Sequence, residues 1–257
     1  MNMRPEWALI TGASSGIGLE LAHVLASEGY NLVLVSQDED RLRTVAQTMH
    51  RQYGVESEAV MIDLVRDDAL VSLTKFLHAK KLHPDIVINN AGFGVYGELA
   101  DTPWKDEQDL IALNITRLTE FTKHFGQEMR RRGSGTIMNV ASIAAFFPGV
   151  RMDVYYASKA YVLSLTLAVA EELRPHGVRV HCLCPGPTHT GFQSRAHATR
   201  SRWFGRPADA SSVAKAAYRG MRRGKLMIVP GWRNKLNIFL ARFTPRAWLA
   251  PLVRRAD

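Results

Sequence analysis

Cysteine is nearly absent from this chain of 257 residues. Only Cys182 and Cys184 occur, two residues apart in the apolar run VHCLCP. Side chains at positions i and i+2 of a strand share one face, and such close neighbours make a poor disulfide. No His pair at ligand spacing accompanies them, so the C-x-C pair is also a weak metal signal. We therefore expect two buried free thiols, no metal site and a reducing compartment.

Long apolar runs are missing too. The longest, at residues 160–170, falls well short of the ~20 residues that span a bilayer and contains a serine and a threonine. The first residues include no apolar segment of signal-peptide length, and no internal repeat or low-complexity linker interrupts the chain. We expect a soluble, cytoplasmic protein of one domain, residues 1–257, in which 46% hydrophobic residues suffice for a large core.

Acidic residues almost vanish from the last quarter of the chain. Residues 1–191 contain 18 Lys and Arg against 22 Asp and Glu, whereas residues 192–257 contain 15 against 2. Such a basic end indicates an anionic partner, a phosphate-bearing ligand or a solvated face. Within residues 232–257, apolar side chains recur at helical spacing: Leu236, Phe239, Leu240 and Phe243. Two prolines, Pro245 and Pro251, limit any continuous helix there. This amphipathic segment either lies on anionic lipid, which would make the protein membrane-associated, or packs on the domain with its basic face in solvent.

The rest of the chain alternates apolar runs with amphipathic stretches. The runs are rich in Val, Ile and Leu without strict alternation, and they cover residues 7–11, 31–36, 57–63, 85–91, 135–142, 178–185 and 226–230. This pattern predicts an α/β fold with a doubly wound, Rossmann-like, seven-stranded parallel sheet and helices on both faces. Residues 188–225 show no clear period, and we interpret them as a substrate lid.

The segment TGASSGIG, Thr11–Gly18, follows the first strand and opens the first helix. Gly12 permits a tight turn, while Gly16 and Gly18 let the backbone approach a pyrophosphate at the helix N-terminus. The glycine spacing is G-x-x-x-G-x-G, which differs from the general G-x-G-x-x-G fingerprint. Phosphate binding is favoured by the position after the first strand, with mere packing of the turn as the alternative.

Two neighbouring tyrosines precede a lysine in YYASKA, residues 155–160. On a helix, Tyr155 and Lys159 are neighbours at i and i+4, and Tyr156 and Lys159 are neighbours at i and i+3. Helix geometry alone therefore does not say which phenol has a chemical role.

Four sequence motifs, taken together, resemble those of a known family and indicate which tyrosine has the chemical role. They are TGASSGIG, the run NNAG at residues 89–92, Ser142 followed by Tyr155 and Lys159, and PGPTHT at residues 185–190. Their order, their spacing and the chain length resemble the single-domain type of the short-chain dehydrogenase/reductase family, over about residues 7–190. The resemblance implies an NAD(P)(H)-dependent oxidoreductase that interconverts a carbonyl and a primary or secondary alcohol.

The resemblance also implies a catalytic set of four residues: Asn114, Ser142, Tyr155 and Lys159. A free phenol has a pKa near ~10, and a nearby ammonium together with an oxidised nicotinamide would lower it. Tyr155 would then give a proton to a carbonyl oxygen or take one from an alcohol. Ser142 would hold the same oxygen, Lys159 would bind the nicotinamide ribose, and Asn114 would position a water or the lysine. Local hydrogen bonding in a loop or helix is the alternative for Ser142 and Asn114.

By the same resemblance a cofactor site follows the carboxyl ends of the strands. Its members are Gly12, Ser14, Ser15, Gly16, Ile17, Gly18, Ser36, Gln37, Arg41, Asp63, Leu64, Asn90, Ala91, Gly92, Tyr155, Lys159, Pro185, Gly186, Thr188 and Thr190. Ser36 stands where NAD-type members carry an Asp, which favours NADP(H) because a carboxylate there would repel a 2′-phosphate. Gln37 replaces the Arg frequent in NADP-type members, so Arg41 would supply the charge, and NAD(H) stays open.

The sequence leaves more than one class of substrate and of function open. An amphipathic C-terminal segment favours a hydrophobic ketone or aldehyde, and a 3-oxoacyl thioester is an alternative. An alternative of another class is a non-catalytic dinucleotide-binding protein, or a basic module that binds nucleic acid or membrane. No nucleic acid is expected, because no nucleic-acid-binding motif accompanies the cations. Small and apolar residues at 161–173 favour a homodimer or homotetramer.

Overall fold

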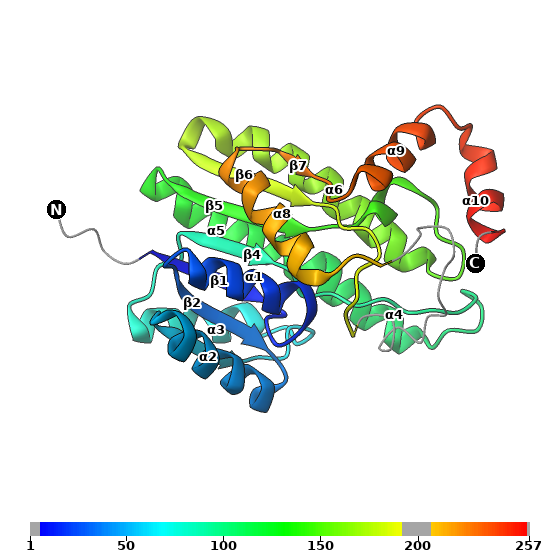
Figure 1. The fold of residues 1–257 in the computed structure, drawn as a ribbon. Coiled ribbons are helices and arrows are strands. Elements are labelled where there is room, and N and C mark those ends of the chain that lie inside the picture. The colour runs from blue at the N-terminus through cyan, green and yellow to red at the C-terminus, as the bar shows by residue number, and fades with distance from the viewer. Residues whose placement is uncertain (1–5, 192–206, 256–257) are drawn as a thin grey trace.

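The seven predicted strands form one parallel sheet. The structure, a computed structural model, describes residues 6–191 and 207–255 (Figure 1). The strands are β1 Trp7–Thr11, β2 Asn31–Ser36, β3 Ser57–Met61, β4 Ile86–Asn89, β5 Gly135–Val140, β6 Val178–Leu183 and β7 Met227–Ile228. Their order is β3-β2-β1-β4-β5-β6-β7, and all neighbours are parallel. The doubly wound fold is confirmed, and its strand order reverses between β1 and β4, where such folds bind ligands.

Five of the strands end two residues earlier than the apolar pattern predicts. They are β3, β4, β5, β6 and β7, which end at Met61, Asn89, Val140, Leu183 and Ile228. The residues just beyond β5 and β6 stay buried, and they still bond to the next strand: Ala141 N donates to the Leu183 carbonyl oxygen and Cys184 N to that of Ile228, both at 2.8 Å. The apolar pattern therefore continues into the loops at the carboxyl edge of the sheet, where a functional crevice is expected.

Helices cover both faces of the sheet. They are α1 Gly16–Ser27, α2 Glu39–Tyr53, α3 Ala69–Lys80, α4 Trp104–Ile111, the π-helical turn η1 Ala112–Arg117, α5 Leu118–Arg132, the short η2 Ile143–Phe146, α6 Asp153–Leu173, η3 Arg174–His176, α8 Ala210–Arg222, α9 Trp232–Ala241 and α10 Arg246–Arg254. Because successive strand residues point to opposite faces, Ile10 of β1 packs with α1, α2 and α8, whereas Leu9 packs with α3 and α5. The buried thiols Cys182 and Cys184 are free, with sulfur atoms 3.7 Å apart.

Residues 188–225, which we expected to form a substrate lid, include the whole of helix α8. Helix α8 packs against α1 and buries Val213, Ala214 and Ala217 in the core. Residues 192–206 lie outside the described part of the chain. Helix α8 is therefore part of the core, and a substrate lid in the rest of residues 188–225 stays a prediction.

The C-terminal helices lie on the crevice side of the sheet. Figure 1 shows α9 and α10 in orange and red at the end of the molecule opposite to the start of β1. Pro245 separates the two helices as expected, but α10 continues through Pro251, contrary to the prediction that this residue limits the helix. At the sixth position of a short helix, a proline removes only one backbone hydrogen bond. No helix within the described ranges combines the length and apolarity needed to cross a membrane.

Candidate active site

A cavity of about 1880 Å³ runs along the carboxyl edge of the sheet. Its walls come from the β1–α1 turn, from the loops after β2 to β6, and from α4 and α6. The segments that carry the four sequence motifs, far apart in the chain, therefore meet in one crevice.

The glycine turn after β1 has the backbone shape that its sequence predicts. Gly12 and Gly16 have positive φ angles of 67° and 57°, which favour glycine. A Cβ on Gly18 would lie 2.2 Å from the Gly12 carbonyl oxygen and 2.5 Å from Asn90 Nδ2, so only glycine fits there. Gly12 and Gly16 line the cavity and Gly18 does not. The turn therefore leaves room for a phosphate group at the N-terminus of α1, which the dinucleotide interpretation requires.

The side chain of Asn90, the residue after β4, holds this turn in place, a contact that the sequence did not predict. Asn90 Nδ2 donates to the carbonyl oxygens of Thr11 at 2.9 Å and Gly12 at 3.2 Å. Thr11 Oγ1 accepts from the backbone N–H groups of Asn90 and Ala91, both at 3.0 Å. The sequence assigned Asn90 a backbone role beside the cofactor; the structure adds a role in holding two motifs together.

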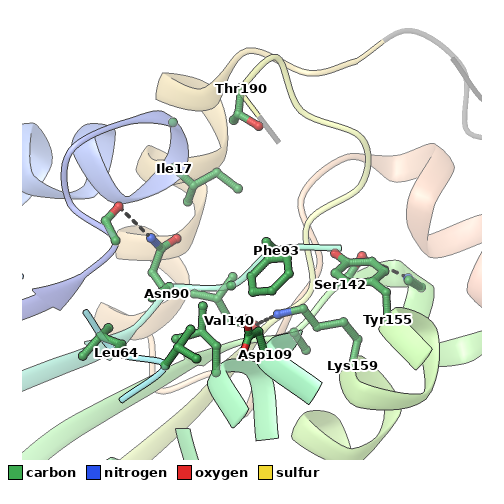
Figure 2. A pocket seen from close by; sticks show the side chains of 18 of the residues that line it. Ile17, Leu64, Asn90, Phe93, Asp109, Val140, Ser142, Tyr155, Lys159 and Thr190 are labelled. Carbon is green, nitrogen blue, oxygen red and sulfur yellow. Dashed lines mark hydrogen bonds between the residues drawn. The ribbon is translucent and has the colours of Figure 1, made fainter. Parts of the chain in front are cut away.

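Ser142 and Tyr155 lie side by side at one end of the cavity (Figure 2). Their side chains share a hydrogen bond. Ser142 Oγ also accepts from Ala144 N at 3.1 Å and donates to the Pro185 carbonyl oxygen at 3.4 Å. Ser142 thus caps η2, as the local alternative proposed, and also faces the phenol. Both hydroxyl groups are placed to bind the same substrate oxygen.

Tyr155 and Lys159 occupy neighbouring turns of α6. Lys159 Nζ lies 5.7 Å from the centroid of the Tyr155 ring and donates to the Val140 carbonyl oxygen at 3.0 Å (Figure 2). The ring of Tyr156 meets that of Tyr155 edge-on and covers Gly149, where a Cβ would lie 2.2 Å from it. Tyr155 is therefore the tyrosine that faces Ser142, while Tyr156 packs beside it and also lines the cavity.

Burial dominates the pKa values of this pair in the chain by itself. Burial raises the pKa of Tyr155 to about 12, against a smaller lowering by the Ser142 hydrogen bond. Burial also lowers the pKa of Lys159 to about 8, and the nearby Cys182 and Cys184 offset part of this. We expected an ammonium group and an oxidised nicotinamide together to lower the pKa of the phenol, and this stays a prediction for the protein with its cofactor bound. In the chain by itself the loss of solvation dominates, and the ammonium group of Lys159 donates to Val140.

Asn114 lies behind the cavity wall, in the π-helical turn η1. It is fully buried, and its Nδ2 donates to the Phe93 carbonyl oxygen at 2.9 Å and to Ser158 Oγ at 3.2 Å. Its Oδ1 accepts from Phe93 N at 3.2 Å. A Cβ on Gly92 would lie 2.9 Å from this oxygen and 3.3 Å from Lys159 Nζ. Asn114 therefore ties the loop after β4 to α6, close to the lysine.

Most of the predicted cofactor residues line the cavity. Besides Gly12 and Gly16 they are Ser14, Ser15, Ile17, Ser36, Gln37, Asp63, Leu64, Asn90, Ala91, Gly92, Tyr155, Lys159, Pro185, Gly186, Thr188 and Thr190. Arg41 does not line it: its Nε lies 3.3 Å from Asp38 Oδ2, and its side chain is mostly exposed. Ser14 Oγ and Ser36 Oγ lie 2.9 Å apart at the end of β2.

Two further parts of the site were not predicted from the sequence. The first is an apolar part of the cavity wall formed by Phe93, Tyr96, Trp104, Val150 and Met152. The second is Arg117, a buried side chain in η1, which donates to the carbonyl oxygens of Leu64 at 3.0 Å and Arg66 at 2.6 Å. Neither carries a motif in the sequence. Within residues 6–191 and 207–255, no group of three His, Cys, Asp or Glu side chains is arranged to hold a metal ion.

The fold and the cavity together define a dinucleotide-binding α/β protein with a Ser–Tyr–Lys arrangement at the carboxyl edge of its sheet. The family model described as short chain dehydrogenase matches residues 6–201. The chain belongs to this family, which confirms the resemblance that the four motifs carry.

Individual relatives agree. The chain is 36% identical over 186 residues to a very-long-chain 3-oxoacyl-CoA reductase of Phaeosphaeria nodorum, a match that covers 70% of this chain and 54% of the relative. The chain thus spans about half the length of that relative. A short-chain dehydrogenase from Sphingobium yanoikuyae in complex with NADPH superposes with a TM-score of 0.83 at 33% identity, covering 88% of each chain. A family member from Burkholderia phymatum in complex with NAD gives a TM-score of 0.81 at 25% identity, covering 94% and 93%.

Proposed function

We propose that this protein is an NADP(H)-dependent oxidoreductase that interconverts a carbonyl group and a primary or secondary alcohol. The observation that carries the proposal is the hydrogen-bonded pair Ser142 and Tyr155 above Lys159, at one end of a cavity whose other end is a glycine turn. The residues present fit a nicotinamide dinucleotide, because Gly12 and Gly16 line the cavity at the N-terminus of α1, where backbone N–H groups can bind a pyrophosphate.

When bound, the dinucleotide supplies a hydride to the substrate carbon or accepts one from it. Ser142 and Tyr155 bind the substrate oxygen through their hydroxyl groups. Because burial keeps the phenol of Tyr155 neutral at neutral pH, it is ready to donate its proton as negative charge develops on that oxygen. The ammonium group of Lys159, beneath the ring, stabilises the phenolate that remains. In the oxidative direction the phenolate takes the proton back from the alcohol.

For the substrate we propose a hydrophobic ketone or aldehyde. The support is the wall of aromatic and aliphatic side chains beside the Ser–Tyr pair, formed by Phe93, Tyr96, Trp104, Val150 and Met152. A 3-oxoacyl thioester is the second candidate, and the name of the relative from Phaeosphaeria nodorum favours it. A panel of bulky ketones, aldehydes and 3-oxoacyl thioesters of increasing chain length, compared by kcat/KM, distinguishes the two classes.

For the cofactor we propose a preference for NADP(H). Ser14 and Ser36 offer hydroxyl groups where β2 meets the cavity, and no carboxylate from the end of β2 lines it. The test compares kcat/KM for NADPH and NADH in the wild type and in Ser36→Asp. The added carboxylate is expected to shift the ratio toward NADH by about tenfold or more, because it repels a 2′-phosphate. A wild type that prefers NADH would contradict the proposal.

Two matched phenol variants test the catalytic assignment. Tyr155→Phe removes the proton donor and keeps the ring, so kcat is expected to fall by about 10²–10⁴ while NADPH affinity stays near that of the wild type. Tyr156→Phe makes the same change one residue away and is expected to retain activity. The assay follows NADPH fluorescence with the best ketone of the panel. Equal losses in both variants would refute the assignment, and NADPH binding without turnover on any substrate would support the non-catalytic alternative.

We further propose that the protein is cytoplasmic and forms homodimers or homotetramers. Helix α6 exposes Tyr161 and Leu167 on its outer side, which supports association through this helix. Light scattering of the wild type and of Leu167→Glu tests it, and a lower mass for the variant is expected. We also propose that the C-terminal segment makes peripheral contact with an anionic membrane surface.

A further inference from the structure

Helix α9 presents an apolar stripe to solvent. At 100° per residue, Trp232, Leu236, Phe239 and Phe243 fall on one side of the helix and of the turn that continues it. Their exposed fractions are 69%, 44%, 55% and 72%. The rings of Phe239 and Phe243 contact each other edge-on, with centroids 5.1 Å apart. We call these four side chains the outer stripe.

The outer stripe is not the face by which α9 packs on the domain. The opposite side of the helix buries Ile238 and places Asn234 against Gly186, where a Cβ would lie 2.5 Å from the Asn234 amide nitrogen. Asn234 Nδ2 also donates to the Pro230 carbonyl oxygen at 2.7 Å. In α10, Val253 is buried as well. The helix is therefore fixed on the domain by one face, and four large apolar groups on the other face have no such partner surface.

Cations flank the outer stripe on both sides. Arg233 lies next to it on one side and stacks over the Trp232 ring at 5.5 Å, while Lys235 and Arg242 lie on the other side. Within the described ranges, no ion pair is recorded for these three cations, and residues 210–255 contain no Asp or Glu at all. Trp248 on α10 is exposed as well. The surface therefore combines aromatic groups with uncompensated positive charge.

This combination matches the interface of an anionic bilayer. Aromatic and aliphatic groups enter the boundary between headgroups and acyl chains, and flanking Lys and Arg bind anionic headgroups. Helix α9 is 10 residues long, about 15 Å, and so lies in the plane of a ~30 Å hydrocarbon core rather than across it. A second copy of the chain fits less well, because a two-fold contact through α9 would bring two cationic surfaces together. We propose that the outer stripe and its flanking cations seat the protein on an anionic lipid surface.

The position of α9 gives this contact a consequence for the substrate, which rests on the proposed function. Helix α9 packs on η2, which follows Ser142, and on the loop that contains Gly186. Both lie at the carboxyl edge of the sheet, where the cavity is (Figure 1). A protein seated by the outer stripe therefore keeps its crevice next to the bilayer, from which a hydrophobic carbonyl compound can enter.

Co-sedimentation of the full chain with sucrose-loaded vesicles tests the proposal. The vesicles contain phosphatidylcholine alone or phosphatidylcholine with phosphatidylglycerol, and the wild type is expected to bind only the second kind, less tightly in high salt. Phe239→Ser with Phe243→Ser removes half of the stripe and is expected to abolish binding. The matched control, Val71→Ser with Leu99→Ser, changes two exposed apolar side chains elsewhere and is expected to bind like the wild type.

A charge series separates the contribution of the cations. Since one cation near an anionic leaflet contributes about 1 kcal/mol, or about fivefold in partitioning, removing three is expected to weaken binding by about a hundredfold. The test variant is Arg233→Gln with Lys235→Gln and Arg242→Gln, and its control is Arg51→Gln with Lys75→Gln and Lys123→Gln. The control lowers the net charge equally on α2, α3 and α5.

Three results would overturn the proposal. They are a wild type that does not bind anionic vesicles, stripe and control variants that bind equally, and a stripe variant that only changes the oligomeric state in light scattering. Reduction of a water-soluble ketone by NADPH, measured on every variant, is expected to stay at the wild-type rate. A wild type that reduces the ketone but does not bind lipid would overturn the proposed lipid contact alone. A wild type that reduces no substrate would overturn the proposed function instead.

Discussion

Replacing the buried Lys159 by methionine should change how the stability of the protein depends on pH. Lys159 is 4% exposed, and burial lowers its pKa from an ordinary value of 10.5 to about 8. Between these two values the unfolded chain binds more protons at this position than the folded chain. The free energy of unfolding therefore gains a contribution from Lys159 as the pH rises from about 8 toward 10.5.

The size of this contribution follows from the two pKa values. The difference between 10.5 and about 8, at about 1.4 kcal/mol per pH unit, corresponds to about 3 kcal/mol. Most of it, about 2 kcal/mol, is recovered between pH 7 and pH 10. Methionine has a similar length and no titrating group, so Lys159→Met lacks this contribution. Over that range Tyr155 stays neutral in the folded protein, because its pKa is about 12.

Urea unfolding at several pH values from 7 to 10 measures the effect. The free energy of unfolding of the wild type is expected to rise relative to that of Lys159→Met by about 2 kcal/mol across the range. Cys182 and Cys184, which face the lysine, are present in both proteins. Lys75→Met, an exposed position on α3, serves as the control and should follow the wild type. If wild type and Lys159→Met run parallel with pH, the lysine is not desolvated as the structure indicates and the reasoning fails.

Three further outcomes are expected from the site. Gly18→Ala places a Cβ 2.2 Å from a backbone carbonyl oxygen and should bind NADPH about tenfold more weakly in a fluorescence titration, at a stability cost of about 1–3 kcal/mol. The control is Gly54→Ala, where the added Cβ meets no other atom; it should cost only the strain of a left-handed backbone and leave NADPH binding unchanged. If both variants weakened NADPH binding equally, the close contact at Gly18 would not be the cause. Arg117→Met removes the donor to the Leu64 carbonyl oxygen and should raise the KM for NADPH about tenfold with kcat changed less than about threefold; a loss in kcat alone would contradict this role. Because the pKa of Tyr155 is about 12, the rate of carbonyl reduction should show no loss from phenol ionisation below about pH 10. A fall in rate below pH 10 would contradict this if its midpoint moved in Ser142→Ala, which changes the surroundings of Tyr155, but stayed the same in Tyr156→Phe.

The sequence predicted the sheet well, because each strand is a short apolar run between helical patterns. It predicted strand ends less well, since Ala141 and Cys184 are buried and each donates a backbone hydrogen bond to the neighbouring strand, although both lie beyond the end of their own strand. The glycine turn and the Tyr155–Lys159 pair could also be placed, because they depend on positions close together along the chain.

Other parts of the site depend on contacts that a linear pattern does not contain. Arg117 contacts a loop about 50 residues earlier in the chain, and Asn90 contacts Thr11, 79 residues earlier, because β4 lies next to β1 in the sheet. Arg41 has the right charge for a phosphate but pairs with Asp38 instead of facing the cavity. The pKa of Tyr155 depends on the depth of the crevice, which only the folded chain defines.

The π-helical turn η1 joins two helices whose side chains face different environments. Helix α4 contributes Trp104 to the cavity wall, whereas α5 buries Phe121 and Phe125 in the core. A π turn holds one more residue than an α turn, so the helix after it is rotated by about 100° relative to the helix before it. Removing a single residue from positions 112–117 would rotate α5 relative to α4 and force either the wall or the core out of alignment. Insertions and deletions should therefore be tolerated far less in this segment than substitutions, although it lies outside the motifs by which the sequence is recognised.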